Sequence, residues 1–148
     1  ALAAGLALRL SDADALRPRA LLLLFPALDD RLASRSSLAF TDSPVWDAAN
    51  TREMWSLYLR GASADGYAAP ARAAALYGLP PTYVLAAEFD PLRDEGVEFA
   101  SRLIAADVPV DLRVWSGAYH VFDQLAPESA LAKASVGDQV QFLRRYML

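Results

Sequence analysis

The stretch that decides the fold runs from residue 78 to residue 96 and reads GLPPTYVLAAEFDPLRDEG. Its centre, Thr82–Phe89, is a largely apolar run that stops at Asp90 and Pro91. Such a run is typical of a strand buried on both faces, as in a parallel sheet covered by helices. Residues 20–25 (ALLLLF, closed by Pro26) and 110–115 (VDLRVW, followed by Ser116 and Gly117) predict two more strands.

Segments with helical spacing of apolar residues surround these strands. Residues 1–10 (ALAAGLALRL) predict a tightly packed helix, and apolar residues recur every three to four positions between residues 97 and 104. At the C-terminal end one apolar stripe is expected from Val136, Val140, Leu143 and Met147. The alternation of helices and strands predicts an α/β fold with a parallel three-stranded sheet, right-handed crossovers and flanking helices.

Composition narrows the class of protein. The chain has 148 residues, of which 55% are hydrophobic and 22% charged, which fits one globular domain. A net charge of -4 without basic runs argues against nucleic acid and anionic membranes as partners, and no segment predicts a membrane span. Cysteine is absent, and one histidine among scattered carboxylates makes a metal site improbable.

The stretch 27–79 is too long for a simple crossover and predicts a helical insertion. Ser43 and Pro44 look like the N-cap and first residue of a helix that ends at Gly61. The aromatic residues Trp46, Trp55 and Tyr58 lie in this insertion. They either belong to the core or line an apolar pocket over the strand ends.

Two residues after the strands have the chemistry of an acid and a base. Asp90 follows the second predicted strand, and His120, the only histidine, lies five residues beyond the third. If the two strands are neighbours, their carboxyl ends are about 5 Å apart. A carboxylate at that distance would orient the imidazole and stabilise its protonated form. The alternative is a loop acid and an unrelated histidine. Asp94 and Glu95 are expected to cap the following helix.

A base of this kind needs a nucleophile, and the G-x-S-x-G turn of the sheet hydrolases does not occur in the sequence. Ser116 is near His120 but sits in the same turn. No other serine has the required frame either. The nucleophile is therefore not expected within residues 1–148.

EFDPLRDEG, followed about thirty residues later by GAYHVF, resembles the C-terminal half of the hormone-sensitive-lipase-like esterases of the α/β-hydrolase fold. The segments PVWDAANTREMWSLYL, PARAAALYGLPP and QFLRRYML are similar in kind, so the resemblance extends over essentially all 148 residues as a partial α/β-hydrolase domain. It implies a serine hydrolase of carboxylic esters, with Asp90 and His120 as catalytic acid and base and no metal or organic cofactor.

The resemblance also implies that the aromatic insertion, Val121 and Phe122 contact a small ester substrate. The family usually has glycine after the histidine, where this chain has Val121. Valine would be strained there if the backbone needs a positive φ, and would narrow the pocket if only space matters.

ALAAGLALRL looks like the helix that follows the family's nucleophile turn, so the chain is expected to begin just after that turn, and without it to be inactive alone. Association through the open edge of strand 20–25 is expected, and a cytoplasmic location is the default. Two other functions stay open: a non-catalytic remnant or interaction module of the same fold, and a serine hydrolase of peptides or lactones.

Overall fold

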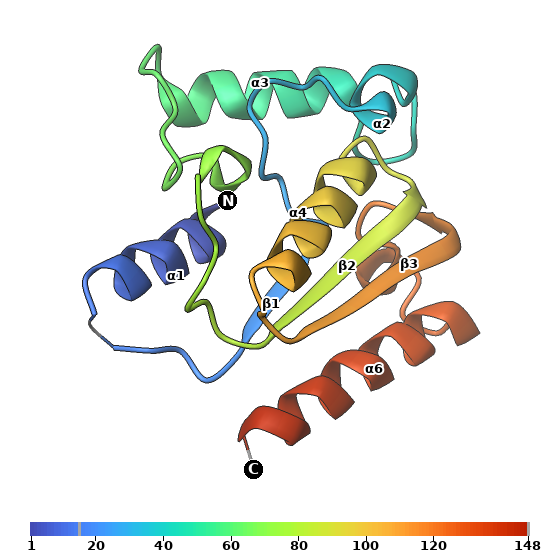
Figure 1. Cartoon of the computed structure of the whole chain (residues 1–148). Coiled ribbons are helices and arrows are strands. Elements are labelled where there is room, and N and C mark those ends of the chain that lie inside the picture. Colours follow the sequence, from blue (N-terminus) through green and yellow to red (C-terminus); the bar gives the residue numbers. More distant parts are fainter. Residues whose placement is uncertain (15, 148) are drawn as a thin grey trace.

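A computed structural model describes residues 1–14 and 16–147. Its centre is a parallel sheet of three strands in the order β1 (Leu21–Leu24), β2 (Thr82–Phe89) and β3 (Val110–Tyr119) (Figure 1). The predicted fold class, a parallel three-stranded sheet flanked by helices, is confirmed.

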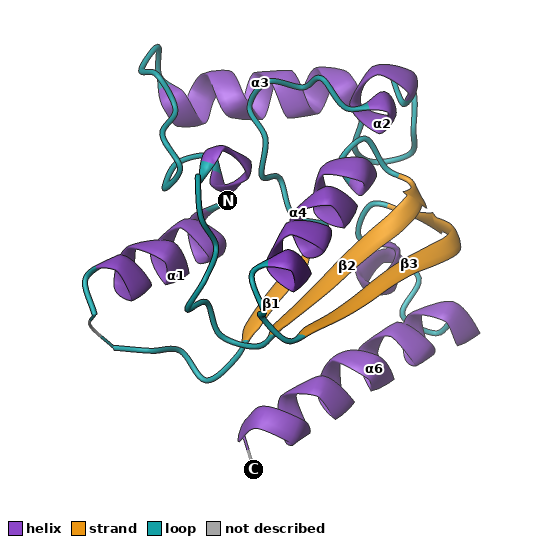
Figure 2. Cartoon of the chain, in the orientation of Figure 1, coloured by secondary structure: helices purple, strands orange, loops and turns teal. Residues whose placement is uncertain are grey.

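Helices cover both faces of the sheet and its carboxyl end (Figure 2). On one face lie α1 (Leu2–Asp12) and α4 (Arg93–Ala105), and on the other lie α5 (Phe122–Leu125) and α6 (Ala130–Met147). The segment between β1 and β2 forms α2 (Arg35–Ala39), α3 (Ala48–Leu59) and the short 3₁₀ turn η1 (Pro70–Arg72). In Figure 1, α2 and α3 lie at the top, where β2 ends.

The strands are apolar throughout because each face of the sheet has its own core. Leu23 and Val84 pack with Phe99 of α4, whereas Tyr83 and Phe142 of α6 pack together on the opposite face. Successive strand residues point to opposite faces, so a strand covered on both sides needs apolar side chains at nearly every position.

The third strand is longer than predicted. Ser116 and Gly117 do not end it, because β3 continues to Tyr119 through a bulge. Ala87 pairs with Trp115 and Phe89 pairs with Tyr119, so β3 uses two extra residues there. The carboxylate of Glu88 holds the bulge by accepting hydrogen bonds of 2.7 Å from the Ser116 hydroxyl and from the Gly117 N–H. His120 therefore follows the strand directly.

The predicted cap of the insertion helix is also wrong. Helix α3 begins at Ala48, and its N-cap is Asp47, whose side chain accepts a hydrogen bond of 2.8 Å from the Asn50 N–H. The Ser43 hydroxyl instead donates to the carbonyl of Trp46. An aspartate cap competes well with serine, and the Pro44 turn keeps residues 44–47 out of the helix.

Large apolar residues of two predicted helices face outward, including most of the predicted C-terminal stripe. Val136, Val140 and Met147 of α6 are exposed, as are Leu2 and Leu6 of α1. The buried faces of these helices consist largely of small residues, among them Ala4, Ala7, Ala132 and Ser135. Small side chains let a helix approach the sheet closely, so they take the inner face although the larger residues show the clearer periodicity.

The strand β1 has a neighbour on one side alone within the described sheet, and Leu24 is partly exposed. Association through this edge stays a prediction. None of the helices described combines the length and the apolar character that a membrane crossing requires.

Candidate active site

The carboxyl ends of β2 and β3 bring an aspartate and a histidine together. Phe89 and Tyr119 are paired at the end of the two strands, so the next residues, Asp90 and His120, are neighbours across the sheet. Nδ1 of His120 lies 2.8 Å from Oδ2 of Asp90. The bulge in β3 sets this match, because it takes up two extra residues between Trp115 and Tyr119; with regular pairing from Trp115 onward, Ala118 would lie opposite Asp90.

The carboxylate of Asp90 is fixed by a second contact. Its Oδ1 accepts a hydrogen bond of 2.9 Å from the Leu92 N–H, and the residue is 1% exposed. An ionised carboxylate can accept hydrogen bonds but not donate them, so Nδ1 of His120 carries the proton between them. This tautomer leaves Nε2 with a free lone pair, and no group in the described residues bonds to it.

Aromatic rings contact the imidazole of His120. The indole of Trp46 is stacked on it, with ring centroids 5.2 Å apart and planes 25° apart. The ring of Phe25, which directly follows β1, lies 5.1 Å away and is tilted by 56°. The imidazole side chain keeps 14% of its surface exposed. The site thus has an oriented imidazole with partly apolar surroundings.

The backbone around the imidazole is strained. Phe25, Val45 and Val121 have φ values of 48°, 71° and 52°. Each lies next to a group of the site: Phe25 contacts the imidazole, Val45 precedes Trp46, and Val121 follows His120. Valine in this region is a genuine outlier, at a cost on the order of 1–3 kcal/mol per residue, and such strain clusters at functional sites.

The residues predicted to bind substrate occupy three different environments. Trp46 and Tyr58 line an open groove of about 470 Å³ along α3. Trp55 is 3% exposed and belongs to the core. Of the two interpretations of the aromatic residues, core or pocket lining, the first therefore applies to Trp55. Phe122 is buried and packs against Phe25. Val121 is half-buried beside His120, and its positive φ meets the condition under which valine is strained.

Sequence reasoning missed several residues near the site. Met54 and Leu57 complete the groove along α3, and Glu53 and Asn50 lie at its polar side. For Phe25 the sequence predicts only the end of a strand. The helical period could have placed Met54 and Leu57 beside Tyr58, whereas nothing local in the sequence predicts the contact between Phe25 and His120.

Glu95 was expected to complement the N-terminal end of a helix, and its position in the first turn of α4 is as predicted. Its side chain points inward instead, where Oε1 accepts hydrogen bonds from the Leu28 N–H (2.6 Å) and the Asp29 N–H (3.3 Å). Oε2 is buried without a partner among the described residues. Burial raises the pKa of Glu95 to about 8, although the two backbone hydrogen bonds favour the charged form.

Within the described residues, no serine hydroxyl forms a hydrogen bond with Nε2 of His120. Ser116, the serine nearest to His120 in sequence, donates its hydroxyl hydrogen to Glu88 at 2.7 Å. Within residues 1–14 and 16–147, no group of three or more histidine, aspartate or glutamate side chains is arranged to hold a metal ion.

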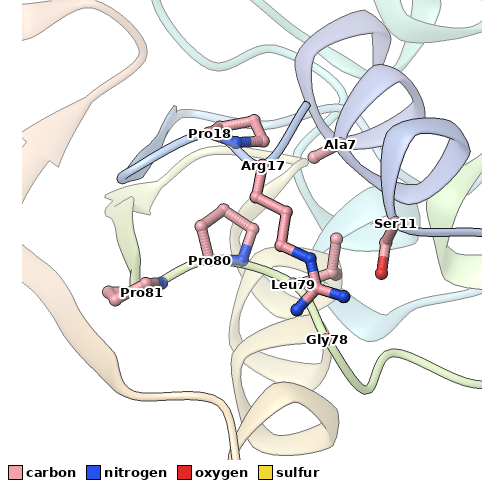
Figure 3. Close-up of a pocket in the computed structure, with 8 residues that line it drawn as sticks. All are labelled: Ala7, Ser11, Arg17, Pro18, Gly78, Leu79, Pro80 and Pro81. Carbon is pink, nitrogen blue, oxygen red and sulfur yellow. The ribbon is translucent and has the colours of Figure 1, made fainter. Parts of the chain in front are cut away.

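A second hollow, of about 320 Å³, lies at the opposite end of the sheet (Figure 3). Residues of α1 and of the loops that enter β1 and β2 line it, and the figure shows the side chain of Arg17 crossing it toward Leu79. The guanidinium group of Arg17 contacts Asp14 at 2.9 Å. Since this hollow adjoins the amino ends of the strands, it is separate from Asp90 and His120.

Comparison with known proteins places this geometry in a family. A family model described as alpha/beta hydrolase fold matches residues 1–124. The chain belongs to the α/β-hydrolase family. In α/β sheets of this kind, ligands bind beyond the carboxyl ends of the strands, which is where Asp90 and His120 meet.

The relatives of this α/β-hydrolase chain are esterases. Carboxylic ester hydrolase LipN of Mycobacterium tuberculosis is 32% identical over 128 residues, which cover 84% of this chain and 34% of LipN. The structure of a bacterial heroin esterase matches with a TM-score of 0.91 and 36% identity, over 98% of this chain and 48% of that one. An esterase of the bacterial hormone-sensitive lipase family matches with a TM-score of 0.89 and 28% identity, over 99% and 49%.

These findings confirm the resemblance to the hormone-sensitive-lipase-like esterases and the hydrolase class. The chain spans about a third of LipN and about half of the two solved esterases.

Proposed function

We propose that this chain supplies the acid and the base of a serine-type carboxylic ester hydrolase. The observation that carries the proposal is the 2.8 Å contact between Nδ1 of His120 and Oδ2 of Asp90 at the ends of adjacent parallel strands. In the α/β-hydrolase fold the catalytic residues follow the order Ser, Asp, His along the chain. Asp90 precedes His120 in the sequence, and both follow strand ends, as the Asp and the His of this order do.

The chemistry follows from the orientation of the imidazole. Nε2 of His120 accepts the proton of a serine hydroxyl while that oxygen attacks the ester carbonyl, and it then returns the proton to the leaving alcohol. Water, activated by the same nitrogen, hydrolyses the acyl-enzyme to the carboxylic acid. Asp90 remains ionised throughout and stabilises the imidazolium. No step of this sequence involves a metal or an organic cofactor.

The serine and the oxyanion donors come, in this proposal, from polypeptide outside residues 1–148. Two observations support this. The Ser116 hydroxyl donates its hydrogen bond to Glu88, and the sequence contains no G-x-S-x-G turn. Residues 1–148 alone are therefore expected to be inactive.

The substrate in this proposal is an ester with an apolar acyl or alkoxy group of short or medium length. The groove along α3 supports it, because Trp46, Met54, Leu57 and Tyr58 give it a largely apolar wall close to His120. An apolar groove with a few polar groups at one end is the usual form of a small-molecule site.

The first test is to read the coding DNA upstream of Ala1. An in-frame G-D-S-A-G-G-like turn preceded by an HGG loop is expected. A stop codon at that point, or an open frame without a nucleophile turn, would overturn the proposal and favour a non-catalytic module.

The second test uses the polypeptide that includes this upstream segment. Asp90→Asn and His120→Ala are expected to lower kcat for p-nitrophenyl butyrate by about 10³- to 10⁴-fold. Glu128→Gln, at a solvent-facing side chain that pairs with Lys133 and not with Asp90 or His120, serves as the matched control and should change nothing. Residues 1–148 alone should hydrolyse the ester no faster than their His120→Ala variant. Retained activity in Asp90→Asn and His120→Ala would refute the assignment.

A further inference from the structure

Trp46 is held in place more firmly than a residue that merely lines a groove needs to be. Its indole Nε1–H donates a hydrogen bond of 2.8 Å to the hydroxyl of Thr51. That hydroxyl in turn donates to the Asp47 carbonyl at 2.9 Å, and Thr51 is completely buried. The Ser43 hydroxyl donates to the carbonyl of Trp46. The indole therefore has one orientation, fixed by the first turn of α3.

The backbone before Trp46 is bent to reach this position. The Trp46 N–H donates to the Pro44 carbonyl at 2.8 Å, which closes a three-residue turn around Val45 at a φ of 71°. This is the rare, strained form of the γ-turn, and valine is poorly suited to it. Such a conformation persists only where the surroundings impose it, which makes it an indicator of function.

The fixed indole lies on the imidazole of His120. The near-parallel planes and the 5.2 Å separation correspond to an offset stack, which is the favoured arrangement for aromatic rings. Phe25 contacts the same imidazole, and Asp90 binds its Nδ1. Rotation of the imidazole away from Asp90 would have to break the stack with Trp46.

We propose that Trp46 is a positioning residue for His120, whose indole, tied to Thr51, holds the imidazole with Nδ1 on Asp90 and Nε2 free. The catalytic consequence rests on the proposed hydrolase function, whereas the positioning itself does not. An aromatic face packs against a neutral ring and also attracts a cation, so the stack with Trp46 can persist in either protonation state of the imidazole.

Nuclear magnetic resonance of residues 1–148 tests the positioning directly, because His120 supplies the only imidazole signals. In Trp46→Ala, the Nδ1 proton of His120 is expected to exchange with water about three- to tenfold faster, since the stack no longer opposes ring rotation. Trp46→Phe keeps an aromatic face and should restore most of the protection. Thr51→Val keeps the indole but removes its anchor, and an intermediate rate is expected.

Trp55→Phe is the matched control, because Trp55 is a buried tryptophan of the same helical segment whose recorded ring contact is with Tyr58. It should leave the His120 signals unchanged. The proposal is overturned if Trp46→Ala exchanges as slowly as the parent, if Trp46→Phe fails to restore protection in a folded chain, or if Trp55→Phe has the same effect as Trp46→Ala.

A kinetic measurement on the polypeptide with its nucleophile separates positioning from substrate binding. A positioning role predicts that Trp46→Ala lowers kcat more than it raises KM, whereas a wall of the substrate groove predicts the reverse. A rise in KM alone would contradict the proposal. Because the magnetic resonance experiment needs no ester hydrolysis, failure of the proposed function and failure of this inference give different results.

Discussion

The two ends of the sheet are built in different ways. At the amino end, prolines lead into the strands, and main-chain hydrogen bonds join them, such as those from the Leu21 N–H to Pro81 and from the Thr82 N–H to Pro109, each 2.9 Å. At the carboxyl end, side chains bind backbone groups, as Glu88 does at the bulge.

Strained valines and buried carboxyl groups are also found at the carboxyl end. The two valines with positive φ, Val45 and Val121, lie there, and so do the buried carboxyl groups of Asp90 and Glu95. The comparison teaches that the packed cores on the two faces of the sheet support a strained end, which is where the proposed catalytic pair lies.

The largest effect on stability is expected from Phe122→Ala. This buried ring packs against Phe25 and Trp115, and its removal should lower the free energy of unfolding by about 3–5 kcal/mol. Leu103→Ala in α4 is the matched truncation away from the site and should cost about 2–5 kcal/mol. Urea denaturation measures both. We expect Phe122→Ala, but not Leu103→Ala, also to shift the nuclear magnetic resonance signals of His120. Equal shifts in both variants would contradict the difference between the two ends of the sheet.

Glu95 should make stability depend on pH. Its pKa of about 8 in the folded chain lies above its ordinary value of 4.5, so the folded chain binds a proton that the unfolded chain has lost. The free energy of unfolding should therefore fall as the pH rises from about 4.5 to about 8. Glu95→Gln should remove this decline and gain on the order of 3 kcal/mol at pH 8 relative to the parent.

Glu98→Gln, one turn further along the exposed side of α4, is the control for Glu95→Gln and should keep the pH dependence of the parent. Chemical denaturation at a series of pH values provides the comparison. A Glu95→Gln variant that declines with pH as steeply as the parent would show that another group titrates.

Relief of backbone strain should give a smaller gain. Val121→Gly removes a valine from a positive φ and is expected to raise the free energy of unfolding by about 0.5–1 kcal/mol, because the strain exceeds the extra freedom of glycine in the unfolded chain. Val136→Gly, at an exposed position of α6, should instead cost about 0.5 kcal/mol. Thermal unfolding of the two variants checks the signs, and the same sign in both would mean that Val121 is not strained.

The smallest effect is expected at the bulge. Hydrogen bonds from the Gly117 N–H and the Ser116 hydroxyl lower the pKa of Glu88, so its contribution to stability is present above about pH 4.5 and is lost as the pH falls below it. Glu88→Gln should thus be slightly less stable than the parent at pH 7 and equal to it in acid. Thr82→Val, at the amino end, removes an uncharged hydrogen bond to Pro80 and should cost the same at both pH values. A pH-independent loss in Glu88→Gln would contradict this.

The sequence predicts the sheet well and its details less well. Continuous apolar runs locate all three strands because a two-sided core demands them, and the stops at Asp90 and Pro91 mark the end of β2. The continuation of β3 through Ser116 and Gly117 depends on the side chain of Glu88 on another strand, which no local pattern reveals. In α1 and α6 the residues that face the sheet are mostly small, because small side chains allow close packing. The larger apolar residues, which give the clearer sequence pattern, face outward.

The candidate site also has features that the sequence predicts and features that it does not. The order of strands makes the meeting of Asp90 and His120 predictable, since both follow strand ends. The stack of Trp46 on His120 and the inward turn of Glu95 depend on contacts between segments far apart in the chain. Physical pattern rules describe local segments, so they do not reach these contacts.

The bulge in β3 has a consequence for anyone who would redesign this chain. A regular ladder from Ala87 and Trp115 onward, with the chain length unchanged, would keep every side chain on its present face, but it would put Ala118 opposite Asp90 and carry the imidazole about 7 Å past the carboxylate. A more regular sheet would then separate the two residues of the proposed catalytic pair, so a design method that rewards regular pairing would remove that pair without any visible defect in the fold.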